Sequence, residues 1–351
     1  MPERLSVLPI PGLPEVVPGD DLAALIVSGL TTAGIDVEDG DVLVVSSKVA
    51  SKALGLVAAD RVAAVAAATR RVVAERALDD GRVTRVVESA AGPVMAAAGV
   101  DASNTGALDG VLLLPENPDE VCASLLERLR VAFEVDRLAV VLSDTSGRPW
   151  RMGQVDFALG AAGLFVVDDL RGASDADGRT LSVTTRAIAD EVAAAADLVK
   201  GKAAGVPVAL VRGVEEFVTG SVGEPGARAL VRTGPEDWFS TGAAEAVRAA
   251  LGVAPGSEVA ERVGIPSISD EPVAVRVRRA VAVALAGQAL DEGLGVDVGE
   301  DALLVTGGDP VDRGILATRI GVALWGEGFA PSIESAAGRG AEAVTVRMRP
   351  R

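Results

Sequence analysis

The chain of 351 residues contains no histidine, no tyrosine and a single cysteine, Cys122. Without histidine, a Ser-His-Asp triad, an imidazole general base and a histidine-bound zinc are excluded. A single cysteine also excludes an internal disulfide, a cysteine-rich zinc site and an iron–sulfur cluster held by this chain alone. Any metal must therefore bind to oxygen ligands, which favours hard cations such as Mg²⁺, Mn²⁺ or Ca²⁺.

Aromatic residues are scarce as well, at 3%, whereas apolar residues make up 49% of the chain. The core must therefore consist mainly of Ala, Val and Leu. The formal net charge of −17 argues against a broad nucleic-acid or anionic-membrane surface, but it leaves room for one basic pocket. No uncharged apolar run reaches about 18 residues, and the N-terminus lacks a signal-peptide pattern. We therefore expect a cytoplasmic protein that binds neither nucleic acid nor membranes.

The apolar pattern predicts strands and helices along the whole chain. Strands are predicted over residues 5–10, 42–45, 138–142, 207–211, 302–305 and 342–348. Helices are predicted from Asp21 to about Leu30 and over residues 60–78, 118–130, 187–202, 273–287 and 310–326. The helix at 118–130 carries Cys122 on an apolar face, where a buried and inert thiol is expected.

The length suggests two domains, at about 150 residues per domain. The composition shifts near GVAPGS at residues 252–257, a stretch typical of a linker. We therefore predict one domain over residues 1–250 and a small α/β C-terminal module over residues 251–351.

Three of four polar clusters next to apolar segments are short. GLPEV at 12–16 taken alone is typical of a turn, and VDASN at 100–104 is typical of an Asx-turn. SSKVASK at 46–52 follows a buried strand and, if helical, places Lys48 and Lys52 on one face. Two like charges favour an anion such as phosphate between them, although a solvated helix start is the alternative. The chain has neither a P-loop nor a Gly-x-Gly-x-x-Gly after a strand, so a nucleotide would bind by another device.

The fourth cluster, SDTSGRPWRMGQ at 143–154, follows the predicted strand 138–142. Asp144 and Thr145 can offer carboxylate and hydroxyl oxygens to Mg²⁺, while Arg148 and Arg151 match the geometry of phosphates and carboxylates. Phosphoryl transfer depends on positioning and charge neutralisation and needs no imidazole. A ligase that activates a carboxylate with ATP or GTP therefore suits a chain without histidine.

These motifs resemble the coenzyme F420-0:γ-glutamyl ligase family, and most closely the N-terminal ligase domain of the actinobacterial bifunctional enzyme. Matching stretches span roughly residues 5–247 in order and include LPIPGLPEVVPGDDLAALI, GDVLVVSSKVASKALG, AAAGVDASN and LSDTSGRPWRMGQVDFALGAAGL. In the bifunctional enzyme a nitroreductase-like domain follows. Residues 251–351 are too few for a complete domain of that kind, so we assign no FMN.

The resemblance implies GTP-dependent addition of L-glutamate to coenzyme F420-0 through γ-linked amide bonds, with an acyl phosphate as intermediate. It implies two divalent cations per site, Mg²⁺ or Mn²⁺, together with K⁺, and GTP as co-substrate. It also implies a family-specific α+β fold and an intertwined homodimer with the site near the interface. The number of glutamates added stays open, as does the choice between F420-0 and its dehydro precursor as acceptor.

Motif matching carries site residues over from the family. The expected GTP-site residues are Leu13, Pro14, Glu15, Val16, Ser47, Lys52 and Asn104. Asp101 and Asp144 would ligate one metal and Thr145 the second. We add Arg148, Arg151 and Gln154 from their residue types, as contacts for phosphate or deazaflavin. Asp144 and the two arginines form the expected catalytic set.

Two other functions stay open. The chain could be an amide ligase of the same fold that acts on another carboxylate acceptor, or a non-catalytic nucleotide-binding scaffold. The presence of Asp101, Asp144 and Thr145 disfavours the scaffold.

Overall fold

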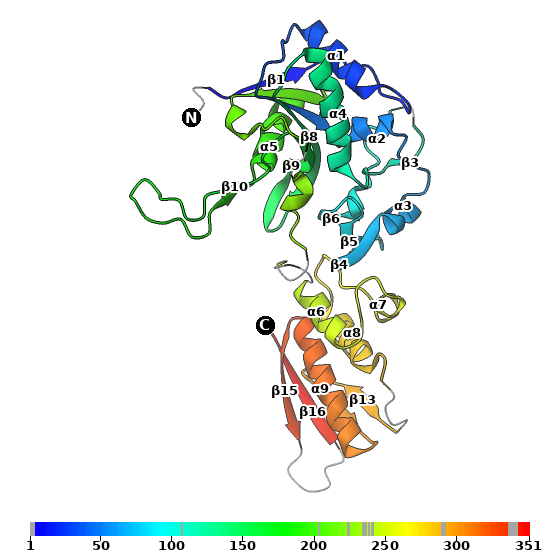
Figure 1. Ribbon diagram of the computed structural model, residues 1–351. Coiled ribbons are helices and arrows are strands. Elements are labelled where there is room, and N and C mark those ends of the chain that lie inside the picture. The colour runs from blue at the N-terminus through cyan, green and yellow to red at the C-terminus, as the bar shows by residue number, and fades with distance from the viewer. Residues whose placement is uncertain are drawn as a thin grey trace. The chain divides into compact units, whose positions relative to one another are not determined.

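The computed structural model describes residues 4–106, 108–202, 204–222, 225–233, 237, 239, 242–288, 293–335 and 343–351 (Figure 1). Contacts divide the chain into two compact units. Unit 1 comprises Met1–Arg71 and Glu88–Glu236, and unit 2 comprises Val72–Val87 and Asp237–Arg351. The predicted boundary after residue 250 falls inside unit 2, and the separate role of residues 251–351 stays a prediction.

Unit 1 contains most of the elements in the first two thirds of the chain. Its helices are α1 (Leu22–Ala33), α2 (Ser47–Ala53), α3 (Arg61–Ala67), α4 (Pro118–Phe133) and α5 (Ile188–Lys200), with short 3₁₀ turns at Ala97–Gly99, Glu215–Phe217 and Ala227–Leu230. Its strands are β1 (Ser6–Ile10), β2 (Asp41–Ser46), β3 (Val57–Ala58), β6 (Val94–Ala96), β7 (Val111–Leu112), β8 (Leu138–Arg148), β9 (Arg151–Ala162), β10 (Asp168–Asp169), β11 (Thr185–Arg186) and β12 (Val208–Arg212).

A five-stranded sheet in the order β1-β12-β2-β8-β9 forms the centre of unit 1. Strands β2 and β8 run parallel, and the other neighbours are antiparallel. Because side chains alternate along a strand, Val42 and Val44 face one side of the sheet and Leu43 and Val45 the other. Helix α5 covers the first side, and α1 and α4 cover the second (Figure 1). The expected mixture of helices and strands is confirmed.

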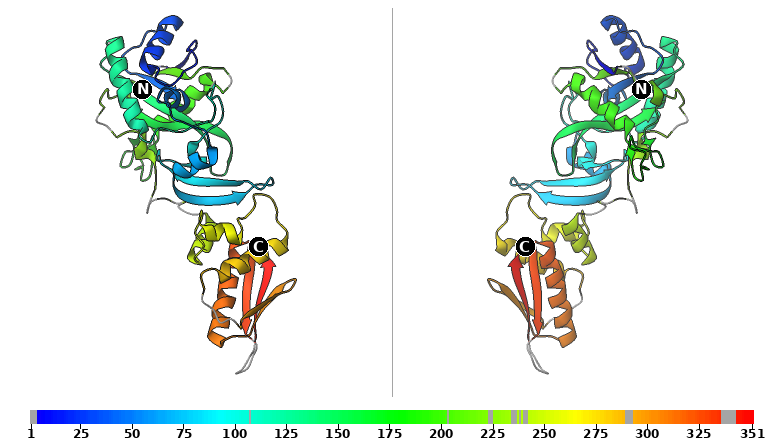
Figure 2. Two further views of the ribbon diagram at one scale, coloured as in Figure 1. Left: turned by 90° about the vertical axis from the view of Figure 1, so that its right-hand side faces the viewer. Right: turned by 90° about the vertical axis from the view of Figure 1, so that its left-hand side faces the viewer.

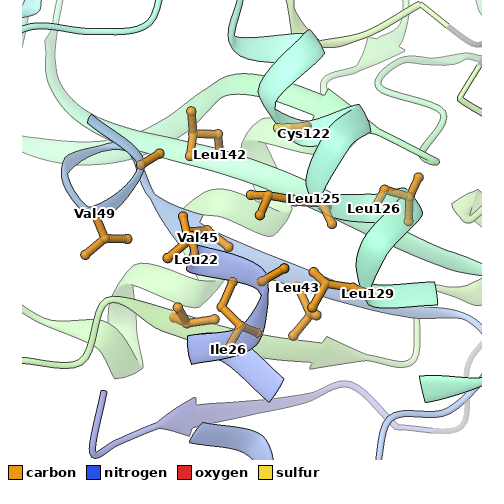
Figure 3. Packing of buried hydrophobic residues seen from close by; sticks show 14 of the residues in the cluster. Leu22, Ile26, Leu43, Val45, Val49, Cys122, Leu125, Leu126, Leu129 and Leu142 are labelled. Atoms are coloured by element: carbon orange, nitrogen blue, oxygen red, sulfur yellow. The ribbon is translucent and has the colours of Figure 1, made fainter. Parts of the chain in front are cut away.

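The core beneath α4 consists of aliphatic side chains, as the scarcity of aromatics requires. In Figure 3, Leu125 and Leu129 of α4 lie against Leu43 of β2, and Ile26 of α1 closes the cluster. Cys122 is fully buried in the same cluster, and burial raises the pKa of its thiol. The prediction of a buried core cysteine is confirmed.

The strand predicted over 138–142 is longer than expected. Strand β8 continues to Arg148 and β9 begins at Arg151, so most of the polar cluster at 143–154 lies in an antiparallel hairpin. A β-bulge between Leu142 and Ser143 shifts the register of the two strands. Polar residues can continue a strand because cross-strand pairing outweighs their weak intrinsic preference.

The helix predicted over residues 60–78 is wrong beyond its first two turns. Helix α3 ends at Ala67, and β4 (Thr69–Ala77) follows and pairs with β5 (Val83–Ser89). Along β4, Val73 and Glu75 are buried on one face. Two adjacent valines lose side-chain freedom in a helix and pack well on a sheet, so a partner strand tips the balance.

Unit 2 contains most of the β4–β5 hairpin together with the C-terminal elements. These elements are α6 (Ala243–Ala250), α7 (Glu258–Val263), α8 (Val273–Leu285), β13 (Gly295–Val298), β14 (Ala302–Thr306), α9 (Pro310–Gly326), β15 (Phe329–Ser335) and β16 (Ala343–Pro350). The last four strands form an antiparallel sheet in the order β13-β14-β16-β15. Helix α9 packs along this sheet, with α8 beside it (Figure 2).

The hairpin is tied to the C-terminal elements by charged side chains. Arg76 of β4 pairs with Glu245 of α6. Arg85 of β5 pairs with the buried Glu75 at 2.8 Å and with Glu261 of α7 at 3.1 Å. The residues from 72 to 87 therefore pack with a part of the chain that lies more than 150 positions away in sequence.

The other predicted helices and strands are confirmed, with ends that differ by a few residues. Asp21 caps α1 by accepting a hydrogen bond from the Ala24 amide, as its position before the helix predicts. Among the described residues, no helix combines the length and apolar character needed to cross a membrane.

Candidate active site

A cavity of about 490 Å³ opens where β2 and β8 end in unit 1. The two strands run parallel, and their register places Ser46 beside Ser143. The carboxyl ends of neighbouring parallel strands thus bring two polar clusters together, although they lie far apart in sequence. The cavity is lined by Leu13, Pro14, Glu15, Val16, Ser46, Lys48, Val49, Lys52, Asn104, Gly106, Ser143, Asp144, Thr145, Asp156, Asp197, Lys200, Gly201, Lys202, Gly205, Val206 and Pro207.

Lysine is confined to this cavity. The chain contains only four lysines among 33 basic residues, and Lys48, Lys52, Lys200 and Lys202 all line the cavity wall. An ammonium group is a compact point charge with three donors, well suited to the oxygens of a phosphate chain. The distribution marks the cavity as a site for an anionic ligand within an acidic protein.

Carboxylates accompany three of the lysines. Lys48 Nζ lies 2.6 Å from Asp101 Oδ2 and also donates to the Ser103 hydroxyl. Lys52 pairs with Glu15, whose side chain is more than half exposed. Asp101 and Glu15 therefore offset the positive charges of Lys48 and Lys52 when no ligand is bound.

The third pair is buried at the base of the cavity. Lys200 Nζ lies 2.8 Å from Asp156 Oδ2, and both side chains are about 95% shielded from solvent. Lys202 forms no ion pair among the described residues, so one ammonium group remains available. The cavity therefore contains three ion-paired lysines and one lysine without an ion pair among the described residues.

Asp144 differs from these carboxylates because no lysine or arginine of the described chain pairs with it. Its Oδ1 accepts a hydrogen bond from the Ser47 hydroxyl at 3.0 Å. Burial, with a smaller contribution from the negative charge of Asp156, raises the pKa of Asp144 to about 6. A cation placed beside Asp144 would stabilise its ionised form.

A family model described as F420-0:Gamma-glutamyl ligase matches residues 12–213, which include the whole cavity. The chain belongs to the F420-0:γ-glutamyl ligase family. The family assignment made from the motifs is thereby confirmed.

Curated relatives support the same assignment. The chain is 38% identical to the coenzyme F420:L-glutamate ligase of Methanopyrus kandleri over 255 residues, which cover 67% of this chain and 97% of that enzyme. It is 41% identical to the coenzyme F420:L-glutamate ligase of Halobacterium salinarum over 230 residues, 59% of this chain and 86% of that enzyme. Nearly the full length of the first relative is thus represented in this ligase-family chain.

The side chains at the cavity offer oxygen ligands that suit a hard cation, but the described residues do not form a complete coordination shell. Asp144 supplies a carboxylate that lacks a cationic partner, and Thr145 supplies a hydroxyl beside it. Asp101 is engaged by Lys48. Nowhere in the described part of the chain do three or more Asp, Glu or Cys side chains form a cluster ready to bind a metal. Phosphate oxygens would have to complete the coordination, as is usual for Mg²⁺ in nucleotide sites.

The structure brings most of the predicted site residues together. The cavity wall includes Leu13, Pro14, Glu15, Val16, Lys52, Asn104, Asp144 and Thr145. Ser47 stands behind Asp144, and Asp101 stands behind Lys48. These ten residues come from four separate stretches of sequence, so the fold assembles the motifs that the family resemblance singled out. Their individual roles stay predictions.

Three predicted residues lie elsewhere. Arg148, Arg151 and Gln154 are exposed on the outer half of the β8–β9 hairpin and do not line the cavity. Arg148 donates to the Met152 carbonyl at 3.3 Å. Within one chain they do not join the other site residues, and contacts to phosphate or deazaflavin stay a prediction for them.

Motif reading missed four charged residues of the cavity wall: Asp156, Asp197, Lys200 and Lys202. Asp156 carried a usable signal, because it lies on the strand that returns after the Asp144 cluster. Lys200 ends the alanine-rich helix α5 and Lys202 follows two residues later, and a basic residue at a helix end is ordinarily solvated. They become part of the cavity wall only because the C-terminal end of α5 packs beside the ends of the sheet strands.

Proposed function

We propose that the protein is a GTP-dependent ligase that joins L-glutamate to coenzyme F420-0 through γ-linked amide bonds. Membership of the ligase family supports the reaction, and the names of the curated relatives support F420 and glutamate as substrates. The observation that carries the proposal is the lysine-lined cavity with Asp144 at its wall. The dehydro precursor of F420-0 is an equivalent acceptor in this proposal.

The lysines would bind the triphosphate of GTP. Lys48 and Lys52 are one helical turn apart on α2, so both ammonium groups reach the same part of the cavity. Lys202 adds a charge that forms no ion pair among the described residues, although Asp197 lies near enough to interact with it electrostatically. Leu13, Pro14 and Val16 provide the apolar surface that a nucleotide base needs.

Asp144 and Thr145, with Asp101, would hold Mg²⁺ or Mn²⁺, two ions in our proposal, and K⁺ would assist. The ions would neutralise negative charge on the phosphates during transfer. The chain's own contribution is to keep Asp144 in place through Ser47 and to keep cationic side chains around the phosphates. A buried carboxylate without a cationic partner suits this task.

The reaction would then proceed in two displacements. The terminal carboxylate of the acceptor attacks the γ-phosphorus, the bond to GDP breaks, and an acyl phosphate forms. The amine of L-glutamate attacks the acyl carbon, loses a proton and expels inorganic phosphate, which leaves the amide. Every step is phosphoryl or acyl transfer, so the absence of histidine is no obstacle.

The assembly and location belong to the same proposal. We propose a family-specific fold that forms an intertwined homodimer in the cytoplasm, with residues 251–351 as an accessory module. Two side chains near the hairpin tip support a second copy: Trp150 is 84% exposed and Met152 is 98% exposed. Both residue types are enriched in protein interfaces.

The decisive experiment incubates the protein with F420-0, GTP, Mn²⁺ and L-glutamate and resolves the products by mass. A mass increment of one or more glutamates on the acceptor, with release of GDP, is the expected result. GTP cleavage that requires a different carboxylate would instead identify an amide ligase of the same fold. Nucleotide binding without any turnover would identify a scaffold.

The distribution of lysine permits a second experiment on binding alone. An amine-reactive reagent can modify only four lysines and the N-terminal amine, and all four lysines lie in the cavity. Saturating GTP with Mg²⁺ should protect lysines from modification, and peptide mass mapping identifies which ones. The N-terminal amine serves as the internal control. Unchanged modification of all four lysines would contradict nucleotide binding in this cavity.

A further inference from the structure

Asp156 stands at the centre of a hydrogen-bond network at the base of the cavity. It lies on β9 directly opposite Thr145 of β8, just beyond the β-bulge. Its Oδ1 accepts a hydrogen bond from the Thr145 hydroxyl at 2.6 Å. Its Oδ2 accepts from the Ser143 hydroxyl at 2.8 Å and from Lys200 Nζ at 2.8 Å. Both oxygens are therefore occupied by donors.

The hydrogen bond to Asp156 decides what Thr145 can offer the cavity. A threonine hydroxyl has one hydrogen and two lone pairs. Because the hydrogen points to Asp156, the oxygen presents only lone pairs elsewhere, as a ligand to a cation must. A partner able to donate would let the hydroxyl turn and would remove this constraint.

Lys200 keeps Asp156 in the accepting role. It is the last residue of α5 and is only 3% exposed, and it donates to the Ser143 hydroxyl as well as to Asp156. A buried ammonium group beside a buried carboxylate stabilises its ionised, acceptor-only form. The register of β8 and β9 and the end of α5 thus act on one hydroxyl.

We propose that Asp156 and Lys200 are positioning residues that turn the lone pairs of the Thr145 hydroxyl toward a divalent cation bound with the nucleotide. The inference rests on the proposed function for the identity of the nucleotide and the cation. Asp156 and Lys200 would not touch the cation themselves but would orient one of its ligands. Removing residues of this kind commonly lowers metal affinity by about 10- to 100-fold.

The test measures Mn²⁺ binding by electron paramagnetic resonance at saturating GDP. Asp156→Asn should weaken Mn²⁺ binding at least about tenfold, because an amide can donate to Thr145. Thr145→Val should produce a comparable loss, and the double variant should lose little more than Thr145→Val alone. GDP binding in EDTA should stay unchanged in all three variants.

Two further variants separate positioning from folding. Asp156→Asn combined with Lys200→Met removes the whole pair without leaving a lone buried charge, and it should show the same Mn²⁺ defect. Asp41→Asn is the matched control, because Asp41 is a buried carboxylate paired with Arg212 at the opposite end of β2. It should lower stability and leave Mn²⁺ binding unchanged.

Wild-type Mn²⁺ affinity in Asp156→Asn, or losses that add in full in the double variant, would overturn the inference. A wild-type protein that binds no Mn²⁺ with GDP would overturn it too. The experiment needs neither F420-0 nor glutamate, so it is independent of the turnover assay. Failure of that assay alone would contradict the proposed function and leave the positioning of Thr145 intact.

Discussion

The cavity of unit 1 and the core of unit 2 pair buried charges with different basic residues. Around the cavity of unit 1 the pairs use lysine, as in Lys200 with Asp156. In unit 2 the central pair uses arginine: Arg279 donates to Glu271 at 2.9 and 2.5 Å and to Glu327 at 2.8 and 2.6 Å. Arg279 is only 6% exposed, so its guanidinium is enclosed by the two carboxylates.

The difference shows what each basic residue is suited to. A guanidinium fork matches two carboxylates in fixed geometry and closes the network, which is a structural arrangement. An ammonium group is compact and flexible and can exchange a carboxylate for a phosphate. We therefore expect charge changes in unit 2 to alter stability, and charge changes in the cavity to alter ligand binding and turnover.

The largest expected effect lies in unit 2. Arg279→Met should lower the free energy of unfolding by about 3–5 kcal/mol, because it leaves Glu271 and Glu327 together without their shared cation. Urea denaturation followed by circular dichroism measures the change. GTP binding under native conditions should be retained. A loss below about 1 kcal/mol would show that the arginine is no more structural than a surface residue.

The next largest effect is expected in the cavity, where a substitution should lower turnover and leave the fold intact. Asp144→Ala should reduce metal-dependent GTP cleavage more than about 100-fold, which exceeds the roughly 10- to 100-fold effect of removing a residue that only positions a metal ligand. Release of GDP with F420-0 and glutamate present measures it, and circular dichroism should show an intact fold. Wild-type turnover would remove Asp144 from the metal site.

The third expected effect is smaller and is a gain in stability, whereas Arg279→Met should cause a loss. Since the pKa of Asp144 is raised to about 6, the folded state favours its protonated form, and ionisation costs stability as pH rises from about 4 to 6. Asp144→Asn avoids this cost, so it should be more stable than the metal-free wild type by about 1–3 kcal/mol at pH 7. At pH 4 the gain should vanish.

Thermal unfolding in EDTA at several pH values measures this difference. Saturating Mn²⁺ and GDP should restore the stability of the wild type but not raise that of the variant to the same extent. An advantage for Asp144→Asn that is the same at pH 4 and pH 7 would contradict the raised pKa.

The smallest effect is expected on the surface of unit 2. Arg347 and Glu334 form an exposed pair on neighbouring strands, at 2.9 Å. Arg347→Ala should change the free energy of unfolding by no more than about 0.5 kcal/mol, because water screens exposed pairs. Urea denaturation beside Arg279→Met gives the comparison within one unit. A loss as large as that of Arg279→Met would break the distinction between enclosed and exposed arginines.

Much of the cavity could be predicted because its parts are short and local in sequence. The apolar runs at Val42–Val45 and Leu138–Leu142 are each followed at once by polar residues. Placing them side by side needs only the pairing of two parallel strands, whose carboxyl ends meet at one edge. Family motifs then pointed to Asp144 and Thr145 among those polar residues.

The missed features depend on contacts between distant residues. Lys200 reaches Ser143 across 57 positions, and nothing near Lys200 in sequence indicates a buried ion pair. Val72 and Val73 suit either a helical face or a strand, and only the presence of β5 decides. The outer half of the β8–β9 hairpin lacks apolar alternation, so its pairing leaves no periodic signal.

The membership of the β4–β5 hairpin in unit 2 has a consequence for synthesis on the ribosome. The hairpin is translated before residue 90, but its partners Glu245 and Glu261 follow more than 150 residues later. At about 5–20 residues per second, the hairpin waits on the order of ten seconds for those partners. During that interval the hairpin lacks its ion-pair partners from α6 and α7, so unit 2 is completed last and we expect the nascent chain to need chaperones most at this stage.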